Sequence, residues 1–205
     1  SPYVLGAWLG DGTSAAAAIT TADAEMVVHL EAEGLVVTPT AGVMRYSLTL
    51  PVEPVPERSC VVCGETFVPR TNQIKTCGRS CGGKSRGTPR REPRCPDCGA
   101  LCTGLAQCQE CRDDHGTVTA LLRKIEVLGN KHIPAAYLRA SESQRRDLLA
   151  GLLDTDGTVT ANGCVQFTTT DPRLLADVLD LVHGLGYRTG ISRKTVRGRR
   201  PESST

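Results

Sequence analysis

Two aspartates, Asp11 and Asp156, occupy the same position, next to last, in two versions of one nine-residue pattern. The pattern reads VLGAWLGDG at 4–12 and LAGLLDTDG at 149–157, with small and apolar residues at helical spacing before Asp-Gly. Two such helices can pack closely, and the two carboxylates would then project together from the helix ends. Adjacent carboxylates repel each other unless a cation lies between them. Oxygen ligands with open positions suit Mg²⁺ that also binds substrate phosphates.

This pair of carboxylates predicts phosphodiester hydrolysis by metal-assisted in-line attack, in which cations activate water and stabilise the leaving oxygen. The alternative is that both Asp-Gly pairs are simple turns between packed helices. Gly12 and Gly157, which follow the two aspartates, are free to take positive φ. Asp154 has no acidic counterpart in the first copy, so we interpret it as a polar group at the helix end rather than a ligand.

Nine of the ten cysteines lie within residues 60–111, and eight of them form pairs separated by two or three residues. Four thiolates close a tetrahedral zinc site and leave no open position, so such zinc is structural. Disulfides and an iron-sulfur cluster are the alternatives, but this clustering favours metal binding in a reducing compartment. Cys102 is left over and could replace Cys98 or Cys108, and Cys164 is expected to be buried. The predicted ligands are Cys60, Cys63, Cys77 and Cys81 for one zinc and Cys95, Cys98, Cys108 and Cys111 for a second.

Positive charge is concentrated in two stretches, although the formal net charge is only +2. Nine Lys or Arg lie within 58–94 against two acids, and six lie within 188–200 with none. Such stretches are typical of proteins that bind the phosphate backbone of nucleic acids. A solvated linker and tail are the alternative. The residues predicted to contact DNA are Arg70, Lys75, Arg79, Lys84, Arg86, Arg90, Arg91, Arg193, Lys194 and Arg197.

The elements that would position the first motif are followed by a linker and an insertion. Asp23 can cap a helix that stops at Gly34. The prolines of PVEPVPE at 51–57 prevent pairing as a central strand. Beyond the cysteines, TVTALLRKIEVLG at 117–129 has the apolar spacing of an amphipathic helix ending at Gly129. Residues 4–10 suit a helix, and residues 15–21 and 35–50 suit strands.

The second half has matching signals. Ser141 with Gln144 predicts a capping box for the helix that carries the second motif. Asp171 with Pro172 predicts the start of another helix, and VQFTT at 165–169 alternates like a strand. These two helices are expected at about 142–154 and 172–183.

These elements together predict an α+β fold of two similar halves. The predicted domains are a first half at 1–57, a zinc-binding insertion at 58–112 and a second half at 113–205. A chain of 205 residues can bury a core. It has no apolar run long enough to span a bilayer and no secretory leader, so we expect a cytoplasmic protein without a membrane partner.

The two copies resemble the motif that names the LAGLIDADG homing endonucleases. The second copy departs from it only at Leu153 and Thr155, and the first keeps the Gly-Ala and Asp-Gly elements. The chain is similar to the two-motif, single-chain (dodecapeptide) branch found mostly inside inteins, such as those of replicative DNA helicases. The resemblance implies a monomeric pseudo-dimer whose antiparallel sheets form saddles over double-stranded DNA. It also implies that Asp11 and Asp156 bind catalytic metal, one for each DNA strand.

The segment GNKHIP at 129–134 resembles the block that precedes the second motif in intein endonucleases. The lysine of that block, Lys131 here, assists catalysis by stabilising charge or orienting water, whereas a loop lysine is otherwise usually solvated. The resemblance therefore implies a site-specific, Mg²⁺-dependent DNA endonuclease with Asp11, Asp156 and Lys131 as catalytic residues. We expect no splicing, because the chain lacks a terminal His-Asn and the flanking β-rich blocks of a splicing domain.

Two other functions remain open for a LAGLIDADG-like scaffold: binding DNA without cutting it, and acting as an RNA maturase. Relatives that only bind DNA tend to lose the acids that Asp11 and Asp156 retain. The few aromatic residues are scattered and offer no platform for stacking single-stranded RNA. The basic residues of the cysteine-rich segment favour an extra DNA-contacting arm, and a stabilising insertion that never touches DNA is the alternative.

Overall fold

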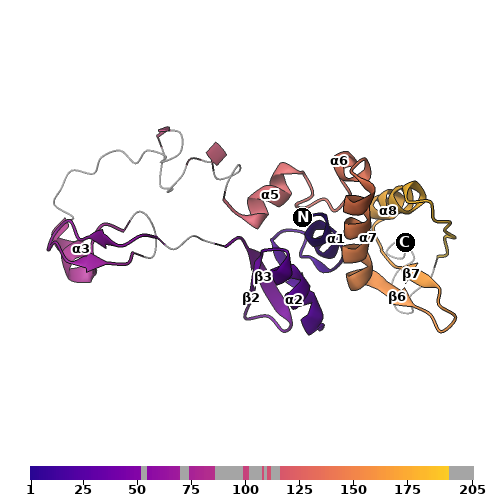
Figure 1. The fold of residues 1–205 in the computed structure, drawn as a ribbon, viewed down its shortest axis with the longest axis horizontal. Coiled ribbons are helices and arrows are strands. Elements are labelled where there is room, and N and C mark those ends of the chain that lie inside the picture. Colours follow the sequence, from indigo (N-terminus) through magenta and orange to yellow (C-terminus); the bar gives the residue numbers. More distant parts are fainter. Residues whose placement is uncertain are drawn as a thin grey trace. The chain divides into compact units, whose positions relative to one another are not determined.

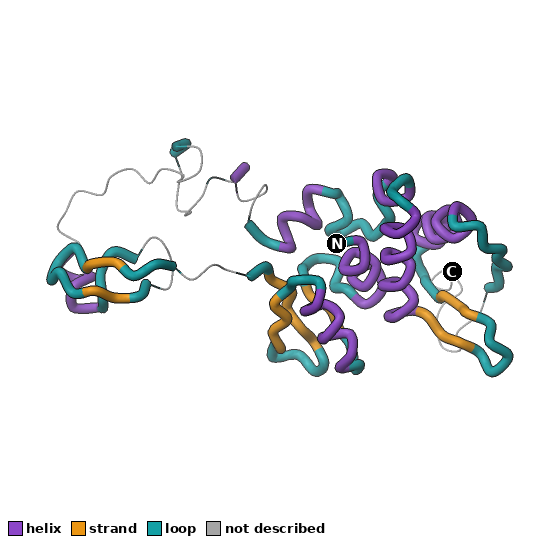
Figure 2. Tube along the Cα trace, viewed as in Figure 1, coloured by secondary structure: helices purple, strands orange, loops and turns teal. Residues whose placement is uncertain are grey.

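Two compact units make up the chain, which is described by a computed structural model (Figures 1 and 2). The first unit comprises Ser1–Leu50 with Thr117–Thr205, and the second comprises Pro51–Gly116. The structure describes residues 1–51, 55–69, 74–85, 99–101, 108, 110–111 and 116–193.

The two helices that end in Asp-Gly pack directly against each other in the first unit (Figure 1). They are α1 (Pro2–Asp11) and α7 (Glu142–Asp156). A Cβ placed on Gly6 would lie 2.2 Å from the Leu148 carbonyl oxygen, and one on Gly151 would lie 2.2 Å from the Tyr3 carbonyl oxygen. Each glycine therefore lies against the backbone of the other helix, which confirms the predicted close approach.

A three-stranded antiparallel sheet and one helix follow the first motif. They are β1 (Ala18–Thr20), α2 (Ala24–Ala32), β2 (Val36–Pro39) and β3 (Arg45–Thr49). The strand order is β1-β3-β2, so the stretch predicted as strand at 35–50 is a hairpin whose turn includes Met44 at φ 54°. Asp23 caps α2 by accepting a hydrogen bond from Glu25 N at 2.8 Å, as predicted.

The faces of this sheet differ in polarity. Directly opposite residues share a face, and Ile19 lies opposite Tyr46 on the face that joins the hydrophobic core. Thr20 and Arg45 form the next pair, so they lie on the other face, and both are exposed. The sequence alternation along β3 therefore separates a core face from a polar, hydroxyl-rich face.

The second motif is followed by a hairpin and a long helix. These are β6 (Gly157–Val159), β7 (Val165–Phe167) and α8 (Pro172–Gly184). The predicted capping box at Ser141 and the predicted N-cap at Asp171 are both present. The prediction that Cys164 is buried is wrong. Cys164 is exposed because it lies at the uncovered end of the hairpin, where the cross-strand pair Val159 and Val165 is exposed as well.

Two short helices, α5 (Val118–Lys124) and α6 (Ala135–Leu138), lead into α7. α5 is shorter than the helix predicted over 117–129, because Glu126 at φ 62° turns the chain before the predicted end at Gly129. The residues between α5 and α6 connect the two helices without regular structure, and they include Lys131.

One hydrophobic core joins both motif helices to the sheet and to α8. It includes Trp8, Ile19, Leu152 and Leu181, each at most 1% exposed. Burying such a side chain contributes about 1.5–3 kcal/mol to folding. Trp8 also donates from Nε1 to the Ala16 carbonyl oxygen at 3.0 Å, which satisfies its polar atom. None of the helices within the described residues is both long and apolar enough to cross a membrane.

The described part of the second unit includes a small hairpin and a short helix. They are β4 (Arg58–Ser59), β5 (Thr66–Phe67) and α3 (Arg79–Ser85). The turn after β4 carries Cys60 and Cys63, and it closes through Gly64 at φ 77°, whose N–H donates to the Cys60 carbonyl oxygen at 2.9 Å. α3 carries Cys81. The hairpin turn and the helix thus supply cysteines from both ends of this part of the chain.

Candidate active site

The carboxylates of Asp11 and Asp156 lie at the adjoining ends of α1 and α7. Both are half-buried, and burial raises the pKa of each. Repulsion by Asp11 further raises the pKa of Asp156. Oδ2 of Asp156 is also close to the other helix, because a Cβ placed on Gly10 would lie 3.4 Å from it. The structure therefore brings together the two acids that the sequence singles out.

The glycines that follow the two aspartates are free to take positive φ, but neither does. Gly12 has φ −71° and Gly157 has φ −88°. Both are extended because they enter strand pairing: Gly12 bridges to Ile19, and Gly157 begins β6. Glycine is required here by space, since a Cβ on Gly12 would lie 2.1 Å from the Trp8 carbonyl oxygen and one on Gly157 would lie 2.2 Å from that of Leu153.

Lys131 reaches from its loop to the end of α1. Its Nζ donates to the Gly10 carbonyl oxygen at 2.8 Å and lies 5.5 Å from the centre of the Trp8 ring. Burial lowers the pKa of Lys131, while the charges of Asp156 and Asp11 raise it. Lys131 is therefore a partly buried cation beside both carboxylates, unlike a solvated loop lysine.

A cleft of about 380 Å³ opens beside Asp156 and Lys131. Its remaining wall is rich in hydroxyl groups from the segment between β7 and α8 and from the loop after α1. The residues that line it are Leu9, Gly10, Ser14, Lys131, Asp156, Thr168, Thr169, Thr170, Asp171 and Leu174. The Asp171 carboxylate of this lining caps α8. A cation, hydroxyl donors and the carboxylate of Asp156 together suit a phosphate group whose charge a metal partly neutralises.

The threonines of this cleft were missed by the sequence reasoning, although a signal for them exists. FTTTD at 167–171 matches ITTAD at 19–23, and in both places the aspartate caps the helix that follows. The repeat thus extends beyond the motifs themselves. Taking the match to include these residues would have placed Thr168 to Thr170 near the second motif.

Asp154 is directed away from this cleft. Its Oδ2 accepts a hydrogen bond from Tyr3 Oη at 2.9 Å across the two motif helices. Burial and the hydrogen bond to Asp154 raise the pKa of Tyr3. Asp154 thus has a partner at the beginning of α1, consistent with its interpretation as a polar group that is not a metal ligand.

The first predicted cysteine set forms one compact cluster in the second unit. The sulfurs of Cys60, Cys63, Cys77 and Cys81 lie within 4.8 Å of one another. The Cys63–Cys77 and Cys77–Cys81 sulfur distances are 3.5 and 3.7 Å. Tetrahedral Zn–S bonds of about 2.3 Å place sulfurs about 3.8 Å apart, so the cluster fits a metal such as zinc. Backbone N–H groups, that of Cys63 foremost, lower the pKa of Cys60 to about 6, which favours the thiolate that binds metal, whereas the neighbouring thiol of Cys63 raises the pKa of Cys77 and Cys81 while no metal is bound.

The remaining predicted residues are described only in part. Cys111 N donates to Cys108 Sγ at 3.4 Å, so two cysteines of the second set are neighbours. Among the predicted DNA contacts, the described side chains Lys75, Arg79, Lys84 and Arg193 are all exposed. Predicted residues outside the described ranges are Arg70, Arg86, Arg90, Arg91, Cys95, Cys98, Cys102, Lys194 and Arg197.

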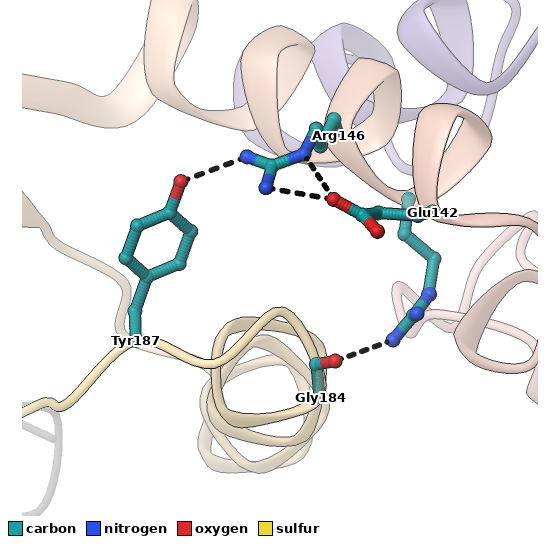
Figure 3. A network of polar contacts seen from close by, with 5 residues as sticks. Glu142, Arg146, Gly184 and Tyr187 are labelled. Carbon is teal, nitrogen blue, oxygen red and sulfur yellow. Dashed lines mark hydrogen bonds and ion pairs between the residues drawn. The ribbon is translucent and has the colours of Figure 1, made fainter.

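A polar network fixes the end of α8 against the beginning of α7 (Figure 3). Arg146 bonds to Glu142 through Nε and Nη2 at 3.0 and 2.8 Å, and its Nη1 donates to Tyr187 Oη at 2.8 Å. Arg145 donates to the Gly184 carbonyl oxygen at 2.9 Å. These exposed contacts are individually weak, but together they hold the residues that follow α8 against the beginning of α7.

Comparisons with known proteins show what the sequence is similar to. Over 203 residues, which are 99% of this chain, the sequence is 41% identical to a replicative DNA helicase DnaB of Mycobacterium intracellulare. The chain spans 22% of the length of that relative. Residues 143–204 match the family model of the LAGLIDADG-like domain. That match begins in α7 and includes the second motif, β6, β7 and α8, so the chain carries a LAGLIDADG-like domain at residues 143–204.

Proposed function

We propose that this chain is a site-specific endonuclease of double-stranded DNA, derived from an intein, that uses Mg²⁺ to hydrolyse one phosphodiester bond in each strand. The observation that carries the proposal is the pair Asp11 and Asp156, which lie half-buried together at the ends of the packed motif helices. The chain is similar to a segment that makes up 22% of the length of a replicative DNA helicase, which supports an intein within such a helicase as the source.

Asp11 and Asp156 would hold the metal. The donor set fits, because two carboxylates are hard oxygen ligands of the kind that Mg²⁺ prefers. Burial raises the pKa of both, and among the described residues Lys131 is the cation that offsets their charge. Bound Mg²⁺ supplies Lewis-acid stabilisation of the charge that develops on the phosphate. Asp154 takes no part, since Tyr3 occupies its carboxylate.

Lys131 would act beside the scissile phosphate. Its ammonium donates to one backbone carbonyl, that of Gly10, and lines the cleft next to Asp156. An ammonium carries three donors. The others are available, in our proposal, to a phosphate oxygen or to the attacking water, which a fixed positive charge orients and polarises.

DNA would lie across the polar sheet faces of two halves related by a pseudo-two-fold axis. Thr20 and Arg45 on the exposed face of the first sheet are suited to phosphate or base contacts. On the second hairpin, the exposed pair Thr158 and Gln166 offers the same chemistry. Arg193, which is exposed after α8, would add a phosphate contact.

The cysteine-rich insertion would bind two structural zinc ions. Its first site is the cluster formed by the two cysteines of the hairpin turn, by Cys77 just before α3 and by Cys81 within α3. We assign the second site to Cys95, Cys98, Cys108 and Cys111, within an insertion at 58–112 that separates halves at 1–57 and 113–205. The exposed side chains of Lys75, Arg79 and Lys84 would contact DNA phosphates, so this insertion would act as a DNA-contacting arm.

The test is cleavage of plasmids that carry the uninterrupted insertion site, with and without Mg²⁺. Wild type is compared with Asp11→Asn and Asp156→Asn, and Asp154→Asn serves as a matched control from the same motif. Magnesium-dependent double-strand cuts that are lost in the first two variants and kept in the third support the proposal. Salt-sensitive binding without cutting would assign the chain to the DNA-binding relatives instead, and binding of a structured intron RNA would assign it to the maturases.

A further inference from the structure

We call residues 129–133, which carry Lys131 between α5 and α6, the strap. The strap contacts the first motif half at two points. Gly129 N donates to the Ser14 carbonyl oxygen at 2.6 Å, and Lys131 Nζ donates to the Gly10 carbonyl oxygen at 2.8 Å. Gly129 has φ 78°, a conformation that glycine adopts without strain. One side of the strap is thus attached to the loop and helix end of the first motif.

The other side of the strap is attached to α8. Asp177 Oδ2 accepts a hydrogen bond from Ile133 N at 2.8 Å, and Arg173 Nη1 donates to Asn130 Oδ1 at 3.0 Å. Arg173 and Asp177 are four residues apart and therefore lie on the same face of the helix. α8 consequently holds the strap on both sides of Lys131.

Burial restricts the strap further. Ile133 is 2% exposed and His132 is 9% exposed. His132 Nδ1 donates to the Asn130 carbonyl oxygen at 2.8 Å, which assigns the ring proton to Nδ1. With its neighbours held in this way, Lys131 leaves the strap in one direction, toward the Trp8 ring and the cleft.

A lysine side chain loses rotamer entropy when it is fixed, so the contacts that support it decide how well it is placed. Groups that act on a reacting centre must be held within about 0.5 Å by contacts behind them. The hydrogen bond to Asp177 is one such contact, because it fixes the backbone only two residues from Lys131.

We propose that Asp177 is a positioning residue for Lys131: by holding Ile133 N–H, its carboxylate fixes the strap and places the ammonium of Lys131 beside Asp156. The inference rests on the proposed catalytic role of Lys131. It extends that role to a residue outside both motifs and outside the lining of the cleft.

A measurement that needs no activity tests the placement. In protein labelled at the lysine ε-carbon, the Lys131 resonance is identified by its loss in Lys131→Met. Because Trp8 is the single tryptophan and lies under the ammonium, its ring current should shift this resonance away from those of exposed lysines. Asp177→Ala should return the resonance to the exposed position. Asp177→Asn, which keeps an acceptor oxygen, should leave it shifted, as should the control Asp180→Ala at an exposed acid of the same helix.

Cleavage kinetics provide the second readout. A displacement of about 1 Å at a catalytic group costs about a hundredfold in rate. Asp177→Ala should therefore lower kcat by up to about a hundredfold with unchanged DNA affinity, and Asp177→Asn should restore it. A Lys131 resonance that stays shifted in Asp177→Ala overturns the inference, whether or not the protein cuts DNA. Absence of cleavage by wild type overturns the proposed function, while the resonance still decides the placement.

If Asp177→Ala fails to fold, Asp177→Glu tests the same inference. This variant keeps the charge and the acceptor but lengthens the side chain by one methylene. If Asp177 positions the strap, the Lys131 resonance should move part of the way toward the exposed lysines. An unmoved resonance in a folded Asp177→Glu protein, with kcat equal to that of wild type, contradicts the positioning role.

Discussion

Gly6 and Gly151 occupy equivalent places in the two motif copies, and each lies against the backbone of the helix that carries the other. A Cβ on Gly151 would lie 2.2 Å from the Tyr3 carbonyl oxygen and 2.7 Å from Ala7 N. These neighbours are backbone atoms that cannot rotate away. The separation of α1 from α7 is therefore set by two missing side chains, and so is the distance between the carboxylates at the helix ends.

Gly151→Ala should destabilise the protein by about 1–3 kcal/mol, the usual cost of overpacking a core. Alanine would otherwise favour a helix interior over glycine by up to about 1 kcal/mol, so a net loss shows that the clash dominates. Urea unfolding followed by helix circular dichroism measures the change. Gly190→Ala is the control, because a Cβ there meets no atom within 4 Å. Equal stability of the two variants would contradict the close packing.

Features that depend on neighbours in the chain could be predicted from the sequence. Asp23, Ser141 and Asp171 cap helices as expected, because an N-cap bonds to N–H groups only two or three residues away. The backbone conformation of Gly12 could not be predicted from its neighbours in the chain. Asp-Gly at a helix end favours a left-handed cap locally, but pairing with Ile19, which is set by the fold, holds the residue extended.

Contacts between distant segments account for what the sequence left open in the candidate site. The identity and order of Asp11 and Asp156 are visible as a repeat, so their meeting could be predicted. Nothing local to Lys131 indicates that its ammonium reaches Gly10, or that Asp177 holds its loop. Those contacts arise only when α8 and α1 are both in place.

Asp156→Asn should stabilise the magnesium-free protein at neutral pH. Burial, followed by repulsion from Asp11, raises the pKa of Asp156 above its ordinary value of 3.8. The native state therefore holds this proton more tightly than the unfolded chain, so wild-type stability falls as the pH rises through the native pKa. Asparagine avoids that loss, and the advantage of the variant should disappear as the pH falls below 3.8.

Urea unfolding of both proteins across this pH range, in buffer free of magnesium, measures the difference. Asp180→Asn, at an exposed acid of α8, controls for a general change in net charge. An Asp156→Asn protein that is less stable than wild type at neutral pH would show that the carboxylate is stabilised by its surroundings, against the direction of its pKa shift.

Cys77→Ser should lower the zinc content by one ion per chain. Cys77 has sulfur neighbours on two sides, Cys63 at 3.5 Å and Cys81 at 3.7 Å, so its loss opens the tetrahedral site. Because such a small unit depends on its metal, residues 51–116 should become sensitive to protease while the first unit stays folded. Metal analysis and limited proteolysis check both outcomes. Cys164→Ser, at an exposed cysteine outside the cluster, should change neither, and unchanged zinc in Cys77→Ser would rule the site out.

Asp154→Asn should keep magnesium-dependent cleavage within a few-fold of wild type, although Asp156→Asn two residues later abolishes it. Asparagine at 154 still offers an acceptor to Tyr3 Oη, whose bond to Asp154 at 2.9 Å joins α1 to α7. Tyr3→Phe removes that bond and should cost about 1 kcal/mol of stability without changing kcat. Parallel measurements of cleavage rate and urea unfolding separate the two roles. Loss of cleavage in Asp154→Asn with an intact fold would instead place the Asp154 carboxylate in the reaction. The assignment of Asp154 as a purely structural residue would then be wrong.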